Sequence, residues 1–202
     1  MTHADAPPAD DVVLTPRADA RFAWAITGSG HFLEESLAIA RALPGVDLFL
    51  SAAAEEVLAL YDIRVEQLKT EFRVFRDKSA SAVPVGTFYA GHYHTVVLAP
   101  ATSNTVAKCA FGLSDTLPTN IFAQAGKLGL PGIVFACDTE PLVVTRSPHD
   151  WVRLRPRNIE LENVDRLRAI DHCQVVCSPE QLRKALDQRL QELSLKWNTL
   201  SS

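Results

Sequence analysis

A glycine-containing segment, Gly28-Ser29-Gly30-His31, follows a run of apolar residues and has the composition of an anion-binding turn. Glycines let backbone N–H groups approach a phosphate closely, and the N-terminus of a following helix adds partial positive charge. A dinucleotide-binding turn would carry a third glycine where Leu33 stands, and an acid where Ser51 ends the next apolar run. Because a serine hydroxyl suits a phosphate oxygen and a carboxylate would repel it, the segment predicts a mononucleotide phosphate site. The alternative is a glycine-rich turn that binds no ligand.

A second segment of small and polar residues, Pro100-Ala101-Thr102-Ser103-Asn104-Thr105, follows another apolar run. It offers hydroxyls, an amide and free N–H groups at a strand-to-helix junction, and its proline fixes the turn. Capping of the following helix would explain Thr102 or Ser103 alone. It would not explain Asn104 and Thr105 as well, so the segment is expected to contact a ligand.

A third group, Ser114 and Asp115, lies in Gly112-Leu-Ser-Asp-Thr116 before the next amphipathic stretch. These side chains could cap the helix that follows, or they could bind ribityl hydroxyls of a ligand. The sequence favours neither interpretation.

The elements that must position these residues are short apolar runs alternating with amphipathic stretches. We expect strands at residues 22–27, 46–50, 72–75, 95–99, 133–136 and 174–176. We expect helices at residues 31–43, 52–61, 102–111, 119–128 and 179–195, the last one capped by Ser178. Residues 141–160 are expected to form a long irregular loop, a type of segment that is often functional.

This alternation predicts an α/β fold: a three-layer, Rossmann-like open parallel sheet with helices on both faces. Ligands of such sheets bind beyond the carboxyl ends of the strands, where the first two segments are expected. A chain of 202 residues fits one domain, which we place at residues 21–202. Residues 1–20 are rich in Pro, Asp and Ala and are expected to form a mobile tail.

Composition narrows the classes of partner. The net charge of -4 argues against nucleic acid, and no apolar run reaches the roughly 18 residues of a membrane span. The acidic N-terminus lacks the apolar core of a secretory signal, so the cytoplasm is the expected compartment. The four cysteines follow neither a CxxC nor a zinc pattern, and we expect reduced, mostly buried thiols and no metal site.

At this point the chain resembles the homo-oligomeric flavin-containing cysteine decarboxylase superfamily, and most closely its archaeoflavoprotein and dihydromethanopterin reductase branch. The resemblance covers roughly residues 21–140. It is carried by Ile26–His31, Ser51–Glu55, Pro100–Lys108 and Gly112–Leu117. The last two of these are similar to the PASANT motif of that superfamily and to the segment that follows it, at the proper distance from each other.

The resemblance implies an FMN-binding protein that forms homotrimers assembled into a dodecamer or larger shell, with the flavin between subunits. Its phosphate would lie near the glycine turn and the residue after the second strand, and its ring and ribityl chain against the other two segments. The implied flavin contacts are Gly28, Ser29, Gly30, His31, Ser51, Pro100, Ala101, Thr102, Ser103, Asn104, Thr105, Ser114 and Asp115.

One departure from the superfamily bears on the reaction. Its decarboxylases carry a histidine about fourteen residues before the PASANT proline, where this chain has Gly86. His92 and His94 lie too close to the strand to replace that histidine, and we expect them at the surface or at an interface. The resemblance therefore implies a reductase that transfers hydride from reduced FMN to a dihydropterin, giving tetrahydromethanopterin from dihydromethanopterin. NAD(P)H or a reduced protein would supply the electrons. The alternatives are an electron-transfer protein served by a ferredoxin-like donor, and a prenyltransferase- or decarboxylase-like member.

Other residues are weaker candidates. Asp138 and His149 could deliver a proton to the substrate, and Cys137 is either near the flavin or a buried structural thiol. Four arginines could meet an acidic pterin tail or simply form a basic surface: Arg146, Arg153, Arg155 and Arg157.

Overall fold

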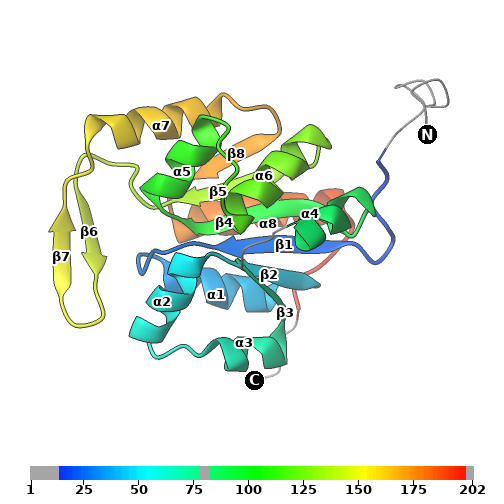
Figure 1. Ribbon diagram of the computed structural model, residues 1–202, viewed down its shortest axis with the longest axis horizontal. Coiled ribbons are helices and arrows are strands. Elements are labelled where there is room, and N and C mark those ends of the chain that lie inside the picture. Colours follow the sequence, from blue (N-terminus) through cyan, green and yellow to red (C-terminus); the bar gives the residue numbers. More distant parts are fainter. Residues whose placement is uncertain (1–13, 78–81, 199–202) are drawn as a thin grey trace.

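A six-stranded parallel sheet forms the centre of the computed structural model, which describes residues 14–77 and 82–198 (Figure 1). Its strands stand in the order β3-β2-β1-β4-β5-β8. Their bounds are β1 (Arg21–Ile26), β2 (Val46–Leu50), β3 (Arg73–Arg76), β4 (Tyr93–Ala101), β5 (Gly132–Ala136) and β8 (Cys173–Val176).

Helices cover both faces of this sheet. One core cluster joins it to α1 (Leu33–Ala42), α2 (Ala52–Leu60), α3 (Val65–Glu71) and α8 (Pro179–Glu192). The other joins it to α4 (Ala82–Tyr89), α5 (Ser103–Ala110), α6 (Leu117–Lys127) and α7 (Asn158–Arg168). The predicted three-layer α/β fold is confirmed.

The central strands are apolar along their whole length because both of their faces are covered. In β1, Phe22, Trp24 and Ile26 face one cluster, while Ala23 and Ala25 face the other. Chain order reverses between β1 and β4, since β2 and β3 lie on one side of this pair and β5 and β8 on the other. Such a reversal is where open α/β sheets bind ligands.

The stretch expected to be an irregular loop is instead a hairpin. Strands β6 (Val143–Arg146) and β7 (Trp151–Leu154) pair antiparallel, and α7 begins soon after them. In β6 the side chains of Val143 and Thr145 are buried while those between and after them are exposed, the alternation of a half-covered strand. The hairpin stands beyond the carboxyl ends of the central strands (Figure 1). The helices α3, α4 and α7 were also not expected from the sequence.

His94 lies in the interior, so the expected surface position was wrong for this residue. It is 4% exposed, and its ring packs edge-on against Phe22 with centroids 4.5 Å apart. Its Nδ1 lies 2.8 Å from Oγ1 of Thr95. Burial, with the nearby Arg189 guanidinium, lowers the pKa of His94 to about 4.

The chain packs onto the domain before β1 begins. The N–H of Arg17 donates to the carbonyl of Gly91 at 2.9 Å, and Leu14 packs against the second core cluster. The rest of the predicted tail, residues 1–13, lies outside the described residues. Across the described ranges no helix is long and apolar enough to cross a membrane.

Candidate functional site

Thr27 joins the turns that follow β1 and β4. Its Oγ1 donates to the carbonyl of Pro100 at 2.8 Å and accepts from the N–H of Thr102 at 2.9 Å. The peptide bond between Ala99 and Pro100 is cis, and Nε1 of Trp24 donates to the carbonyl of Ala99. These bonds hold the two ligand-candidate segments side by side at the point where the strand order reverses.

Both glycines of the first turn have close neighbours, Gly28 against Ala53 on a helix and Gly30 against the end of the Tyr61 side chain. A Cβ atom on Gly28 would lie 2.7 Å from Cβ of Ala53, and one on Gly30 would lie 2.0 Å from Oη of Tyr61. The N–H groups of Gly30 and His31 donate to no backbone carbonyl in the described part of the chain. They are therefore free to receive an anion, beside the N-terminus of α1.

A cavity of about 350 Å³ opens next to this turn. Gly28, Ser29, Gly30, His31 and Thr102 line it, so it brings together residues from both predicted segments. The remaining walls come from α2, from the end of β5 and from the hairpin: Val57, Leu60, Tyr61, Cys137, Asp138, Val143, Thr145, Arg146, Ser147, Pro148, Val152 and Leu154.

A second cavity, of about 480 Å³, lies between the N-terminal end of α1 and the hairpin. It shares Gly30, His31, Tyr61, Thr145 and Arg146 with the first cavity, among other residues. Oη of Tyr61 donates to the carbonyl of Arg146 at 2.9 Å, which fastens the hairpin to the end of α2. Burial, reinforced by the charge of Glu34, raises the pKa of Tyr61.

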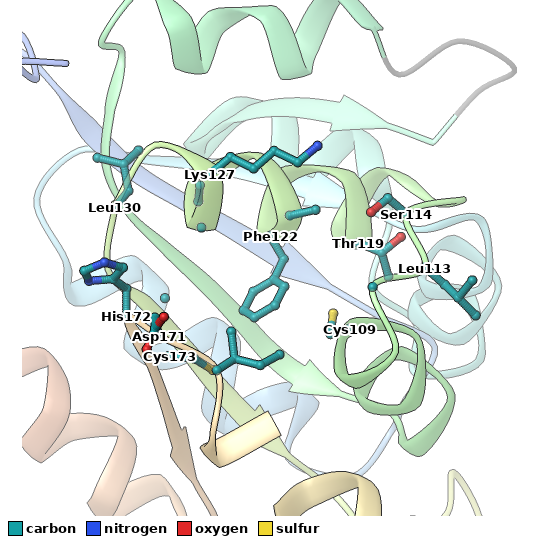
Figure 2. Close-up of a pocket in the computed structure, with 16 residues that line it drawn as sticks. Cys109, Leu113, Ser114, Thr119, Phe122, Lys127, Leu130, Asp171, His172 and Cys173 are labelled. Atoms are coloured by element: carbon teal, nitrogen blue, oxygen red, sulfur yellow. The ribbon is translucent and has the colours of Figure 1, made fainter. Parts of the chain in front are cut away.

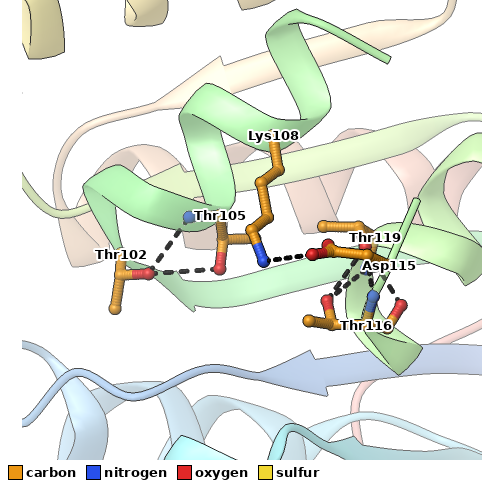
Figure 3. Close-up of polar contacts among 6 residues, drawn as sticks. All are labelled: Thr102, Thr105, Lys108, Asp115, Thr116 and Thr119. Atoms are coloured by element: carbon orange, nitrogen blue, oxygen red, sulfur yellow. Dashed lines mark hydrogen bonds and ion pairs between the residues drawn. The ribbon is translucent and has the colours of Figure 1, made fainter. Parts of the chain in front are cut away.

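The other predicted contacts are partly occupied in capping. Oγ of Ser51 accepts from the N–H of Ala54 at 3.0 Å and caps α2. Thr102 caps α5 by accepting from the N–H of Thr105 at 3.2 Å (Figure 3). Pro100, Ala101 and Thr105 are buried, Ser103 is half-buried and Asn104 is exposed.

Ser114 and Asp115 lie away from this cavity. Both are exposed in the loop between α5 and α6, where Nζ of Lys108 donates to Asp115 at 2.8 Å (Figure 3). That hydrogen bond holds the pKa of Asp115 below its ordinary value. The residue that caps α6 is Thr116, so the cap is neither Ser114 nor Asp115.

Ser114 belongs instead to an apolar cavity of about 200 Å³ beneath α6 (Figure 2). Cys109, Phe122 and Cys173 form its centre, with Leu130 at one end and Leu113 at the other. Burial raises the pKa of both thiols to about 12, so they remain neutral.

The sequence pattern of the Flavoprotein family matches residues 13–196, nearly the whole chain. The chain belongs to the Flavoprotein family. This membership confirms the resemblance drawn from the glycine turn and the PASANT-like segment.

Relatives of this Flavoprotein include two archaeal proteins. An uncharacterized protein of Methanocaldococcus jannaschii is 36% identical over 175 residues, which are 82% of this chain and 94% of that protein. A dihydromethanopterin reductase (acceptor) of Methanosarcina mazei is 33% identical over 174 residues. That match covers 80% of this chain and 66% of the reductase.

A solved structure has the same fold. The crystal structure of Burkholderia xenovorans DmrB in complex with FMN is 65% identical and superposes with a TM-score of 0.84. The match covers 89% of this chain and 99% of DmrB, which is described as a cubic protein cage for redox transfer.

In this Flavoprotein, few ionisable side chains line the cavity beside the Gly28–Gly30 turn. Burial lowers the pKa of His31, with Asp138 and Glu35 opposing that shift. Oγ of Ser103 donates to Oδ2 of Asp138. The thiol of Cys137 donates to Oγ of Ser29 at 3.2 Å, and burial raises its pKa to about 12. Cys137 therefore lies at the predicted place near the turn but stays a neutral thiol.

Of the four arginines, Arg146 lines both cavities. Arg153 and Arg155 are exposed on or just after β7, and Arg157 pairs with Glu160 at the start of α7. His149 is exposed at the hairpin turn. Tyr61 and Thr145, which line both cavities, carried no signal in the sequence, because nothing in their spacing marks them as site residues.

Proposed function

We propose that this chain binds FMN and uses the reduced flavin to transfer a hydride to a dihydropterin, giving tetrahydromethanopterin from dihydromethanopterin. One observation carries the proposal: the Gly28–Gly30 turn and Thr102 face one cavity at the sheet's reversal point, in a chain 65% identical to FMN-bound DmrB. The coarser part, a flavin-dependent oxidoreductase, rests on that identity and on the family. The pterin as acceptor rests on the name of the Methanosarcina mazei reductase, of which the chain covers 66%.

The residues present fit FMN. The free N–H groups of Gly30 and His31 suit its phosphate, and the close approach of Ala53 to Gly28 leaves no room for a side chain there. Thr102 and the apolar residues of α2 and the hairpin suit a planar ring with a polar edge. Bound FMN supplies the hydride chemistry, and the protein supplies position and surroundings.

This chain's own residues would do three things. Thr27 holds the phosphate turn and the turn after β4 at a fixed separation. The hairpin, fastened by Tyr61, covers the cavity and excludes water from it. Reduction of an imine also needs a proton at the ring nitrogen, and His31, Asp138 and Tyr61 are among the groups that line this cavity and can hold one.

The proposal extends to assembly. Ser114 and Asp115 lie on a different part of the surface from the Gly28–Gly30 turn, so within one subunit they do not reach the same cavity. If copies of this chain form homotrimers within a cage like the cubic cage described for DmrB, these residues would contact the flavin of a neighbouring subunit.

The test begins with the purified protein loaded with FMN. Absorption peaks at ~375 and ~450 nm that bleach on anaerobic reduction are expected of a redox-competent flavoprotein. Addition of dihydromethanopterin should then restore the oxidised spectrum. Protein that cannot be loaded with FMN would overturn the proposal at its first step.

The same anaerobic absorption experiment tests whether the electron acceptor is dihydromethanopterin or a protein. Reduced protein that ignores dihydromethanopterin but is reoxidised by a ferredoxin would make this chain an electron carrier and would refute the pterin assignment. Chemical reduction is used first, so that the result does not depend on the donor. NADH, NADPH and reduced ferredoxin are then compared as donors.

A further inference from the structure

The β6–β7 hairpin concentrates positive charge. Residues 141–157 contain four arginines and one acidic residue, Asp150, in a chain whose net charge is -4. One of these arginines, Arg157, pairs with Glu160. The other three are exposed and form no ion pair with any of the described residues: Arg146, Arg153 and Arg155. Like charges on neighbouring strands repel one another, so the stability of the hairpin does not explain them.

The hairpin has two faces, because side chains alternate along each strand. Antiparallel pairing places Val144 opposite Arg153, and Arg146 opposite Trp151. These four residues share one face, which we call the outer hairpin face. The other face lines the cavity beside the Gly28–Gly30 turn, through Val143, Thr145, Val152 and Leu154.

The outer hairpin face has the composition of a surface that binds protein. Trp151 is 72% exposed and Val144 is 56% exposed, beside the arginines. Tryptophan and arginine are the residue types most enriched where proteins bind one another. Arg153 and Arg155 line neither the first nor the second cavity, so a small molecule bound in either does not account for them. Exposed, unpaired arginines beside apolar surface fit an acidic protein.

The place of this face suggests what that protein does. The hairpin is a single layer of two strands at one side of the domain (Figure 1), and its other face lines the proposed flavin cavity. A protein on the outer hairpin face would therefore stand about 10 Å from that cavity, the thickness of one sheet layer. A hydride donor must touch the flavin, whereas an electron can cross such a gap without contact. The partner that this geometry suits is a carrier of single electrons.

We propose that the outer hairpin face, together with Arg153 and Arg155, docks an acidic protein that carries a one-electron redox group and reduces the bound FMN. This inference rests on the proposed function, because it names the electron donor of that reaction. Two donor molecules, each oxidised by one electron, supply the two electrons that reduce one FMN, and two protons come from water.

The test uses full-length protein loaded with FMN, and an acidic ferredoxin as the probe. Binding is measured by calorimetry with both proteins oxidised, so no electron transfer is needed. The double variant Arg153→Gln/Arg155→Gln should raise the dissociation constant about tenfold at low ionic strength. Added salt should weaken binding by the original protein and reduce the difference between the two.

A matched control removes the same amount of charge elsewhere. Lys184 on α8 and Lys196 after it are exposed, and neither belongs to the hairpin. The double variant Lys184→Gln/Lys196→Gln should bind the ferredoxin within about twofold of the original protein. An equal loss in this control would mean that overall charge, and not the hairpin, attracts the probe.

A second readout follows electrons. Reduced ferredoxin should reduce the flavin of the arginine variant about tenfold more slowly than that of the original protein, at ferredoxin concentrations below saturation. Reduction by dithionite should be unchanged, because this small reductant needs no docking surface. FMN affinity and the mass of the assembly should also be unchanged, since these arginines line neither cavity and are assigned to the partner.

Each outcome decides the matter. Weaker ferredoxin binding and slower reduction in the arginine variant alone support the docking surface. No binding by the original protein at low ionic strength, an unchanged arginine variant, or a change in the mass of its assembly overturns it; the last result would assign this face to contacts between copies of the chain. Failure of the proposed function looks different: flavin that ferredoxin reduces through the arginines, yet that no dihydropterin reoxidises.

Discussion

The cavity beside the Gly28–Gly30 turn and the cavity beneath α6 lie in the same domain and differ in what lines them. The first collects hydroxyls, an imidazole, a carboxylate and free N–H groups from the ends of several elements. The second is centred on Phe122 and on two thiols that burial keeps neutral. The first cavity therefore offers a ligand several hydrogen bonds, whereas the second offers mostly apolar contact, with a few polar residues such as Ser114 and His172 in its lining.

This difference assigns ligand binding to the first cavity and stabilisation of the fold to the second. Groups at the carboxyl ends of the central strands, among them Ser29 and Thr102, line the first cavity and are positioned for a ligand. Side chains around α6 belong largely to the second core cluster, so they contribute mainly to the stability of the fold. Substitutions in the first region should change affinity, and those in the second should change the free energy of unfolding.

The largest effect is expected for Phe122→Ala, beneath α6. Phe122 is 8% exposed and packs against the backbone of Gly132, so its removal enlarges the cavity. The free energy of unfolding, measured in urea, should fall by about 3–4 kcal/mol. Folded variant protein should keep its FMN affinity within about twofold. A large loss of FMN affinity at unchanged stability would contradict this expectation and would show that the cavity beneath α6 is part of the flavin site.

The next effect is expected for Gly28→Val in the phosphate turn. The new side chain would meet Ala53 of α2 and displace the turn from its ligand. The dissociation constant for FMN, measured by fluorescence titration, should rise at least ~100-fold, about 2.7 kcal/mol. Binding within tenfold of the original protein would contradict the placement of the phosphate.

Lowering the pH should destabilise the protein through His94. The pKa of His94 is about 4 in the folded protein against 6.5 as its ordinary value, so the unfolded chain binds protons more readily. Stability from this residue is complete above pH 6.5 and falls as the pH drops toward 4, by about 3 kcal/mol. Urea unfolding across this range should show the slope, and His94→Gln should remove it. A slope that persists in the variant would assign the effect to another group.

The smallest effect is expected for Gly126→Ala, on α6. A Cβ atom there meets nothing within 4 Å, and alanine favours the helix, so stability should rise by about 0.5–1 kcal/mol. FMN affinity should not change. Gly28→Val and Gly126→Ala together compare a glycine that the flavin site requires with one that it does not. Destabilisation by Gly126→Ala would show that this second glycine is also required.

Much of the scaffold could be predicted because its strands are covered on both faces and read as apolar runs. The expected strand at 22–27 is β1 (Arg21–Ile26), and that at 46–50 is β2 (Val46–Leu50). The hairpin could not be predicted, because its strands have only four residues each and β7 is exposed throughout. Its link to α2, a hydrogen bond from Tyr61 to the carbonyl of Arg146, is a long-range contact that local sequence periodicity does not reveal.

The site could be predicted where the local backbone conformation requires a particular type of residue. Gly28 and Gly30 mark a turn that admits no side chain, and the structure gives the reason in Ala53 and Tyr61. Thr145 has no such mark, since its place in the lining of both cavities exists only in three dimensions. The contacts expected of Ser114 and Asp115 remain predictions, because they depend on a neighbouring subunit.

The central claim is tested most directly by a single turnover without oxygen. FMN-loaded protein is reduced, freed of reductant and mixed with dihydromethanopterin, and flavin and pterin are measured together. We expect one tetrahydromethanopterin for each flavin reoxidised, and a much lower yield with Gly28→Val, which should bind FMN at least ~100-fold more weakly. Flavin that stays reduced in the presence of dihydromethanopterin would contradict the account.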